Sequence, residues 1–311
     1  MTAPLRIAVI GRTEILYDTA SALVDAGYSI ACVLTAKEAP EYTRTASDFK
    51  TLAETLEVPF AQGVPIASHA PFLGDARADI AVSINYTGVI PQSVIDIFPM
   101  GILNAHGGDL PRYRGNACQA WAILNGESRI GLCIHRMVGG ELDSGDIVAR
   151  KYLLIDHDTK VTDAWKWMAR EVPGMMVETV NHLAVDPQYV LERQSRDPAH
   201  ALRCYPRRPE DGRINWSRPA LEVLRLINAS NKPYAGAFCE LEGRRMIIWD
   251  AALLEDGEVY CAVPGQVTSV GRSHITIACG SGKLMIRQIQ FEGEAESSPD
   301  RYVTSIRKRL T

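Results

Sequence analysis

Three residues with chemically useful side chains lie in or near one short stretch, ILNAHGGDLPRYRG, which covers residues 102–115. Asn104 and His106 are separated by one residue, so both side chains point to the same face of an extended chain. Asp143 follows later, in the turn ELDSGD. An amide can donate to a negatively charged oxygen, and an imidazole beside a carboxylate can move protons. These three residues are therefore the candidate catalytic groups.

Each of these residue types also has an ordinary structural role. A single histidine after a strand is commonly just a hydrogen-bonded polar residue, and Asn and Asp are common in turns, where their side chains bond nearby backbone. The interpretation therefore rests on the joint pattern and not on any one residue. Asp109, in the same stretch, is the least favoured of the polar candidates.

The elements that must position these residues alternate between strands and helices. Short apolar runs typical of buried strands cover residues 5–11, 29–35, 78–85 and 100–108, and residues 13–28 have helical spacing. This alternation predicts an open, doubly wound, mainly parallel α/β sheet of Rossmann-like type. Ligands of such sheets bind outside the carboxyl ends of the strands, which is where Asn104 and His106 lie.

The composition changes in the second half of the chain. The region around residues 191–216 is rich in Pro, Arg and Asp, as a linker between domains is. Short strands separated by glycines follow it and predict a small β-barrel or sandwich. We therefore expect a catalytic domain over residues 1–190, a linker over 191–216 and a small, OB-like β-barrel domain over 217–311, with a C-terminal tail that forms a short helix or frays.

The overall composition disfavours several classes of protein. A net charge of −4 provides no basic field for bulk nucleic-acid binding. The seven cysteines form no C-x-x-C pair, which favours reduced thiols in the cytoplasm over disulfides or structural zinc. No apolar run approaches the roughly 18 residues of a membrane span. Neither a P-loop nor the G-x-G-x-x-G dinucleotide motif follows the first strand.

The motif NAHGGDLPRYRG, followed by WAILNGE, GLCIHRMV and LDSGDIV, resembles the folate-dependent formyltransferases. The segments YPRRPEDGRINW and INASNKPYAGAF are similar to the entry of the C-terminal domain in the sugar-nucleotide members, where that domain is a small β-barrel. The resemblance implies transfer of a formyl group from N10-formyltetrahydrofolate to a primary amine, without a metal. One departure is Gly107-Gly108-Asp109, where many members carry Ser-Leu-Leu-Pro shortly after the histidine.

The resemblance also implies roles for individual residues. Asn104 would donate to the oxyanion of the tetrahedral intermediate, and His106 would act as general base or as a second oxyanion partner. Asp143 would orient His106 and help to take the proton. The folate would bind the loop over residues 85–91 and the turn before Asp143, although core packing is an equal alternative for the apolar members. The implied folate contacts are Tyr86, Thr87, Gly88, Val89, Ile90, Leu110, Arg114, Val138 and Asp146.

Composition favours a nucleotide-linked amino sugar as the amine, with a 4-amino-4,6-dideoxyhexose for a surface glycan such as lipopolysaccharide or O-antigen as the expected acceptor. A nucleotide diphosphate needs a few cations and a stacking ring. The candidates are Arg12, Thr13, Arg207, Arg208, Trp216 and Tyr234. Pairing of the adjacent arginines with Glu210 and Asp211 is the structural alternative.

Two other functions stay open at this stage. One is formylation of methionyl-tRNA, and the other is a non-catalytic folate-binding or tailoring module. For the preferred function we expect no nucleic-acid partner and no membrane partner. The family resemblance suggests a homodimer, with the second domain as a plausible interface.

Overall fold

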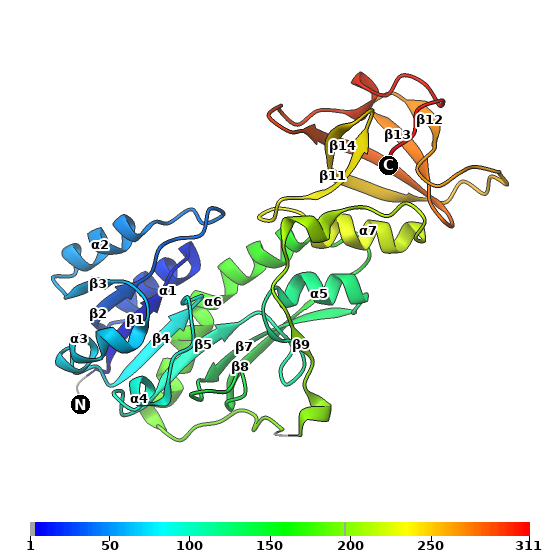
Figure 1. Cartoon of the computed structure of the whole chain (residues 1–311). Coiled ribbons are helices and arrows are strands. Elements are labelled where there is room, and N and C mark those ends of the chain that lie inside the picture. Colours follow the sequence, from blue (N-terminus) through cyan, green and yellow to red (C-terminus); the bar gives the residue numbers. More distant parts are fainter. Residues whose placement is uncertain (1–3, 196) are drawn as a thin grey trace. The chain divides into compact units, whose positions relative to one another are not determined.

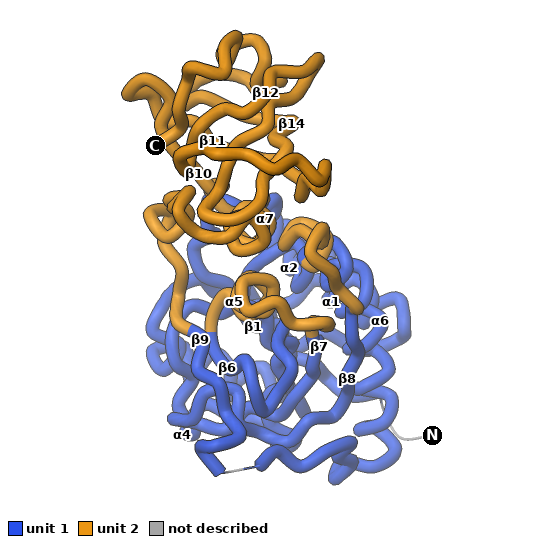
Figure 2. The backbone as a smooth tube through the Cα atoms, turned by 90° about the vertical axis from the view of Figure 1, so that its right-hand side faces the viewer, with its two compact units in different colours: residues 1–115, 131–153, 165–204 blue, residues 116–130, 154–164, 205–311 orange. Residues whose placement is uncertain are grey.

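The computed structural model describes residues 4–195 and 197–311 and divides into two compact units. Unit 1 contains residues 1–115, 131–153 and 165–204, and unit 2 contains residues 116–130, 154–164 and 205–311 (Figure 2). Within the described residues, no helix is both long and apolar enough to cross a membrane. Composition led us to expect domain limits at residues 190 and 216, and these limits remain a prediction alongside the division into two units.

A seven-stranded sheet organises the first part of the chain (Figure 1). Its strand order is β3-β2-β1-β4-β5-β7-β8, in which β1 to β5 run parallel and β7 runs antiparallel to β5. This confirms the expected mainly parallel α/β sheet. The strands are β1 (Arg6–Gly11), β2 (Ser29–Thr35), β3 (Phe60–Gln62), β4 (Ile80–Ile84), β5 (Ile102–His106), β7 (Arg129–Arg136) and β8 (Ile147–Leu154).

The central strands are apolar along almost their whole length because both faces of the sheet are buried. Side chains that point to either face are therefore in the core. The helices between and after these strands are α1 (Glu14–Asp25), α2 (Ala46–Thr55), α3 (Ala70–Asp75), α4 (Gln92–Ile95) and α6 (Val161–Val185). The strand order reverses between β1 and β4, which are neighbours. A crevice for ligands is expected at such a reversal, outside the carboxyl ends of β1, β4 and the adjacent β5.

The turn between β1 and α1 shows how tightly the chain packs at this reversal. Gly11 has φ of 133°, and a Cβ there would lie 2.1 Å from the carbonyl oxygen of Ile84. Thr13 then caps α1, its hydroxyl accepting from the backbone N–H of Leu16 at 3.3 Å. A side-chain cap satisfies one of the N–H groups that the first turn of a helix leaves unpaired.

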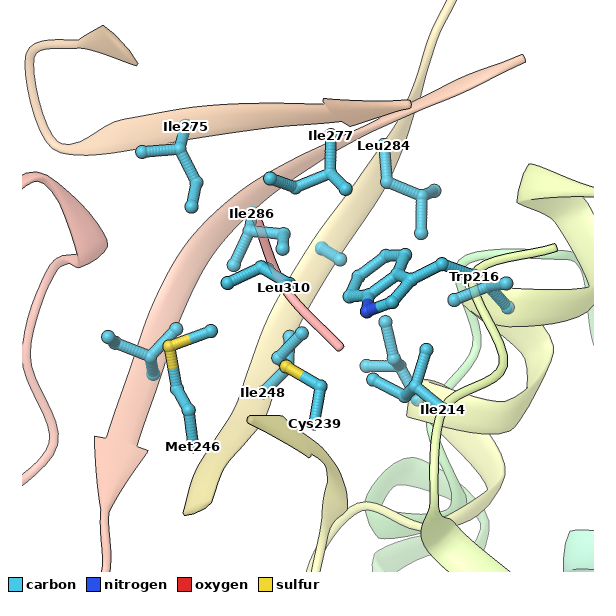
Figure 3. Close-up of a cluster of buried hydrophobic side chains, with 14 of the residues drawn as sticks. Ile214, Trp216, Cys239, Met246, Ile248, Ile275, Ile277, Leu284, Ile286 and Leu310 are labelled. Atoms are coloured by element: carbon cyan, nitrogen blue, oxygen red, sulfur yellow. The ribbon is translucent and has the colours of Figure 1, made fainter. Parts of the chain in front are cut away.

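Unit 2 contains a five-stranded antiparallel sheet, which confirms the smaller β domain. Its order is β10-β11-β14-β13-β12, and α7 (Ala220–Ala229) contributes buried side chains to the same core. Figure 3 shows part of this core, including Ile248, Ile277 and Ile286 from the strands. The last residues do not fray: Leu310 bridges Leu241, and Arg309 bridges Gln266. The strands are β10 (Ala237–Leu241), β11 (Arg244–Leu254), β12 (Val267–Gly271), β13 (His274–Ala278) and β14 (Lys283–Phe291).

Three separate stretches of chain build unit 2. Helix α5 (Cys118–Asn125) is tied to the later part of the unit by Trp121, whose indole N–H donates to the carbonyl of Tyr205 at 2.9 Å. The amide nitrogen of Asn228 donates to the carbonyl of His157 at 2.8 Å. The compact unit is therefore discontinuous in sequence.

Candidate active site

Asn104 and His106 are placed by β5 on one face at its carboxyl end. The antiparallel pairing of β5 with β7 sets Asn104 opposite His135 and His106 opposite Cys133. Side chains directly opposite each other on one face of a sheet are close enough to interact. Accordingly, Nδ2 of Asn104 lies 3.1 Å from Nε2 of His135.

Asp143 lies in the turn between β7 and β8 and reaches both histidines. Its Oδ2 is 3.6 Å from Nδ1 of His106, and its Oδ1 is 3.5 Å from Nε2 of His135. The backbone N–H of Gly115 donates to Oδ2 at 2.9 Å. The structure therefore brings together all three predicted catalytic residues, with His135 as a fourth member of the cluster.

The surroundings of Asp143 favour its ionised form. Burial alone opposes ionisation of this carboxyl. Electrostatic attraction to His106 and the hydrogen bond from the backbone N–H of Gly115 outweigh that effect and hold the pKa of Asp143 well below its usual range. Asp143 is therefore a carboxylate at neutral pH and a weak proton acceptor.

His106 is a hydrogen-bond donor in this structure. Its Nε2 lies 2.7 Å from the carbonyl oxygen of Tyr113, and a carbonyl can only accept, so Nε2 carries a proton. Gly108 makes this contact possible, because a Cβ there would lie 2.3 Å from the Tyr113 oxygen and 2.5 Å from Nε2. The arrangement favours His106 as a donor to a developing oxyanion over His106 as a base through this nitrogen.

The loop after β5 is anchored by charge and by apolar packing. Asp109 accepts from Arg150 at 2.6 Å, and the same guanidinium donates to Glu192 at 2.9 Å. Leu110 is 1% exposed and packs with Cys133 and Ile147. The side chain of Leu110 is therefore part of the core, and its expected contact with the folate stays a prediction.

Arg114 and Asp146, both expected to bind the folate, help to hold the turn that carries Asp143. Arg114 donates to Oε1 of Gln194 at 2.9 Å, while the backbone N–H of Gln194 donates to Asp146 at 3.2 Å. Nε2 of Gln194 donates to the carbonyls of Asp143 at 2.9 Å and Gly145 at 2.6 Å. Gln194 is thus a buried clamp on this turn.

The loop after β4 contains the other expected folate contacts. Thr87, Gly88 and Val89 are exposed at the carboxyl edge of the sheet, where they are available to a ligand. The hydroxyl of Tyr86 donates to the carbonyl of Gly63 at 2.9 Å, and its ring packs against the core.

Two of the apolar folate candidates differ in burial. Ile90 is 4% exposed and packs inside a core cluster, and its expected contact with the folate stays a prediction. Val138, after β7, is only half-buried and stays a candidate.

The expected substrate contacts in unit 1 have structural partners. Arg12 donates to the carbonyls of Asn85 at 3.0 Å and Lys37 at 2.7 Å, and its guanidinium lies over the ring of Tyr42. Thr13 is fully buried, and its hydroxyl is used by the cap of α1. The expectation that Thr13 binds substrate through its side chain is therefore corrected.

In unit 2, Arg207, Arg208 and Tyr234 line one pocket. Arg207 donates to the carbonyl of Ala229 at 3.2 Å and to the hydroxyl of Ser230 at 3.0 Å. Burial of its guanidinium lowers the pKa of Arg207 from the ordinary arginine value. The structure therefore gathers three of the four substrate candidates from this part of the chain.

Trp216 is the fourth, and it is a core residue. It is 4% exposed and packs among Ile214, Cys239 and Leu310 (Figure 3). A ring buried in this way presents no face on which a nucleotide base can stack. The expectation for Trp216 is corrected accordingly.

Sequence reasoning missed His135 and Gln194. His135 is a histidine within the otherwise apolar run of a buried strand, and that isolated polar residue was the available signal. Gln194 falls in the stretch interpreted as a linker, where nothing in the sequence marked it. Among the described residues, no group of three His, Cys, Asp or Glu side chains is arranged to hold a metal ion.

Solved structures with the same fold include sugar N-formyltransferases. WlaRD, described as a sugar 3N-formyl transferase, has a TM-score of 0.66 and 16% identity, over 94% of this chain and 99% of that one. The N-formyltransferase of Helicobacter canadensis has a TM-score of 0.68 and 13% identity, over 91% and 99% of the two chains. At these identities the comparison shows the fold alone.

Sequence comparisons identify the family in addition to the fold. The methionyl-tRNA formyltransferase of Solibacter usitatus is 30% identical over 294 residues, covering 93% of this chain and 92% of the relative. That of Acetivibrio thermocellus is 28% identical over 304 residues, covering 96% of each. The family described as formyl transferase matches residues 5–180, and the formyl transferase C-terminal domain matches residues 207–307. With both of its domains matched in this way, the chain belongs to the formyl transferase family.

Proposed function

We propose that this protein transfers a formyl group from N10-formyltetrahydrofolate to the primary amine of a nucleotide-linked amino sugar. The observation that carries the proposal is the convergence of Asn104, His106 and Asp143 at the carboxyl end of β5. Two related solved structures support the choice of donor, since WlaRD was solved in the presence of 5-N-formyl-THF and the Helicobacter canadensis enzyme in complex with folinic acid.

The reaction makes one carbon–nitrogen bond and breaks another, and it moves one proton. The neutral amine attacks the formyl carbon, and a tetrahedral intermediate forms with negative charge on the formyl oxygen. The bond from carbon to N10 then breaks, and the proton lost by the amine ends on N10. Preorganised donors aimed at the oxyanion stabilise such an intermediate.

The side chains of this chain supply those donors. One N–H of Asn104 and the Nε2–H of His106 donate to the oxyanion, once His106 turns away from the carbonyl of Tyr113. Exchanging that hydrogen bond for one to a charged oxygen is favourable, because bonds to ionised partners are stronger than neutral ones. Asp143, held as a carboxylate, stabilises positive charge on His106 as the amine proton moves through the site.

The proposed acceptor is a nucleotide-linked 4-amino-4,6-dideoxyhexose for a surface glycan. Two sugar N-formyltransferases share the fold over more than nine-tenths of this chain, and one was solved with dTDP-3-aminofucose. Arg207, Arg208 and Tyr234 are the proposed contacts of the diphosphate and base. A cytoplasmic location and a homodimer are part of the proposal; the seven free cysteines support the location.

Formylation of methionyl-tRNA is the second candidate. It is favoured by curated relatives that carry this name and align over nearly the whole chain. Against it stand the net charge of −4 and a short loop after β5 in which Asp109 offsets one of two arginines. Acceptor-stem phosphates require positive charge for binding.

A substrate panel separates the candidates. The protein is incubated with N10-formyltetrahydrofolate and UDP-, dTDP- or GDP-linked amino sugars, with charged initiator methionyl-tRNA in parallel. We expect formylation of one nucleotide sugar, reduced in an Arg207→Ala variant, mainly through a higher KM. Formylation of tRNA alone would establish the second candidate, and no turnover of any amine would favour a non-catalytic folate-binding module.

A further inference from the structure

His135 is the one buried histidine of the cluster that the proposed reaction leaves without a role. It is 1% exposed and lies directly opposite Asn104 in the pairing of β5 with β7. Its Nε2 faces the amide nitrogen of Asn104 at 3.1 Å and Oδ1 of Asp143 at 3.5 Å. The ring is therefore placed between two residues of the proposed site.

The backbone determines which nitrogen of His135 carries the proton. Nδ1 lies 2.9 Å from the carbonyl oxygen of Arg136, which can only accept, so Nδ1 is protonated. In the neutral ring Nε2 then has a lone pair and accepts from the N–H of Asn104. A flipped amide would direct the oxygen of Asn104 at that lone pair and lose the bond.

We propose that His135 is a positioning residue that fixes the orientation of the Asn104 amide. The inference rests on the proposed function, in which Asn104 donates to the oxyanion. A primary amide has two N–H groups. One N–H of Asn104 is held by His135, so the other N–H is directed away from β7 and is available to the formyl oxygen. An amide that is free to flip would also present its oxygen to the substrate. That oxygen would repel the developing negative charge.

A double-mutant cycle tests this role kinetically. We expect His135→Leu to lower kcat about 10- to 100-fold, approaching the effect of losing an oxyanion donor, with the KM for folate changed less than about threefold. In an Asn104→Ala background the same change should lower kcat less than about threefold, because there is no amide left to orient. His135→Gln, which keeps an acceptor, should recover part of the activity.

The control is His182→Leu, which removes an exposed histidine of the same unit and should leave kcat unchanged. An equal loss of kcat from His135→Leu in both backgrounds would show a merely structural role and overturn the inference. Wild-type protein that turns over no amine would instead overturn the proposed function.

A second measurement needs no substrate. In protein labelled with 15N at asparagine, the Asn104 side-chain signals are identified by their loss in Asn104→Ala. We expect one of the two protons to exchange slowly in the wild type and rapidly in His135→Leu. Equal exchange in both proteins would overturn the inference whether or not an acceptor is known.

Discussion

Replacing Gly108 by alanine tests how closely the loop after β5 is folded onto His106. An added Cβ would lie 2.3 Å from the carbonyl oxygen of Tyr113, and real Cβ contacts essentially never fall below 3.0 Å. The loop must therefore open by about 0.7 Å, the difference between these two distances, or His106 must leave the Tyr113 carbonyl. Overpacking of this kind costs about 1–3 kcal/mol.

The expected outcome for Gly108→Ala is a free energy of unfolding lower by about 2 kcal/mol and a kcat lower by roughly 10- to 100-fold, since displacements near 1 Å cost up to about 100-fold. Urea denaturation and a formyl-transfer assay measure the two effects. Gly174→Ala is the control, because its Cβ would meet nothing within 4 Å, and alanine in helix α6 should stabilise by about 0.5–1 kcal/mol. Wild-type stability and activity in Gly108→Ala would refute the proposed packing of this loop.

Three further substitutions test the cluster. Asp143→Asn should lower the free energy of unfolding by about 2 kcal/mol at pH 7. Because the folded-state pKa of Asp143 is depressed, this difference in stability should persist down to about pH 5 and shrink below about pH 4, which urea titrations at each pH will measure. Gln194→Ala should lower stability by about 1–3 kcal/mol, since it leaves two turn carbonyls unpaired, and should lower kcat more than the KM for folate; an unchanged kcat would mean that the clamp does not position Asp143. Asp109→Asn should destabilise by about 1–3 kcal/mol with Arg150 left partly unpaired, measured against exposed Asp18→Asn as the control.

Much of the fold could be predicted because its signals are local. The apolar runs of β1, β2, β4 and β5 were separated by helical spacing, and that alternation alone implies a parallel sheet. The convergence of Asn104 and His106 was also predictable, because alternation along one strand places them on the same face.

The parts that could not be predicted depend on pairing between distant segments. His135 joins Asn104 only through the register of β7 against β5, and a shift of one residue would turn it to the other face. Gln194 comes from irregular chain, whose path carries no periodic signal. Other residues were named as site contacts from the sequence but are buried in the structure, namely Trp216, Leu110 and Ile90. The sequence does not distinguish an apolar side chain that lines a pocket from one that fills the core.

The discontinuous make-up of unit 2 has a consequence for protein engineering. Exchange of residues 205–311 between relatives would transfer the sheet and α7 but leave behind α5 and the segment 154–164, which belong to the same unit. If this chain receives a foreign segment, the indole N–H of Trp121 loses the carbonyl of Tyr205, and the carbonyl of His157 loses the amide of Asn228. Both groups would then have to find partners in the foreign segment. A chimera designed to change acceptor specificity should therefore carry all three stretches together.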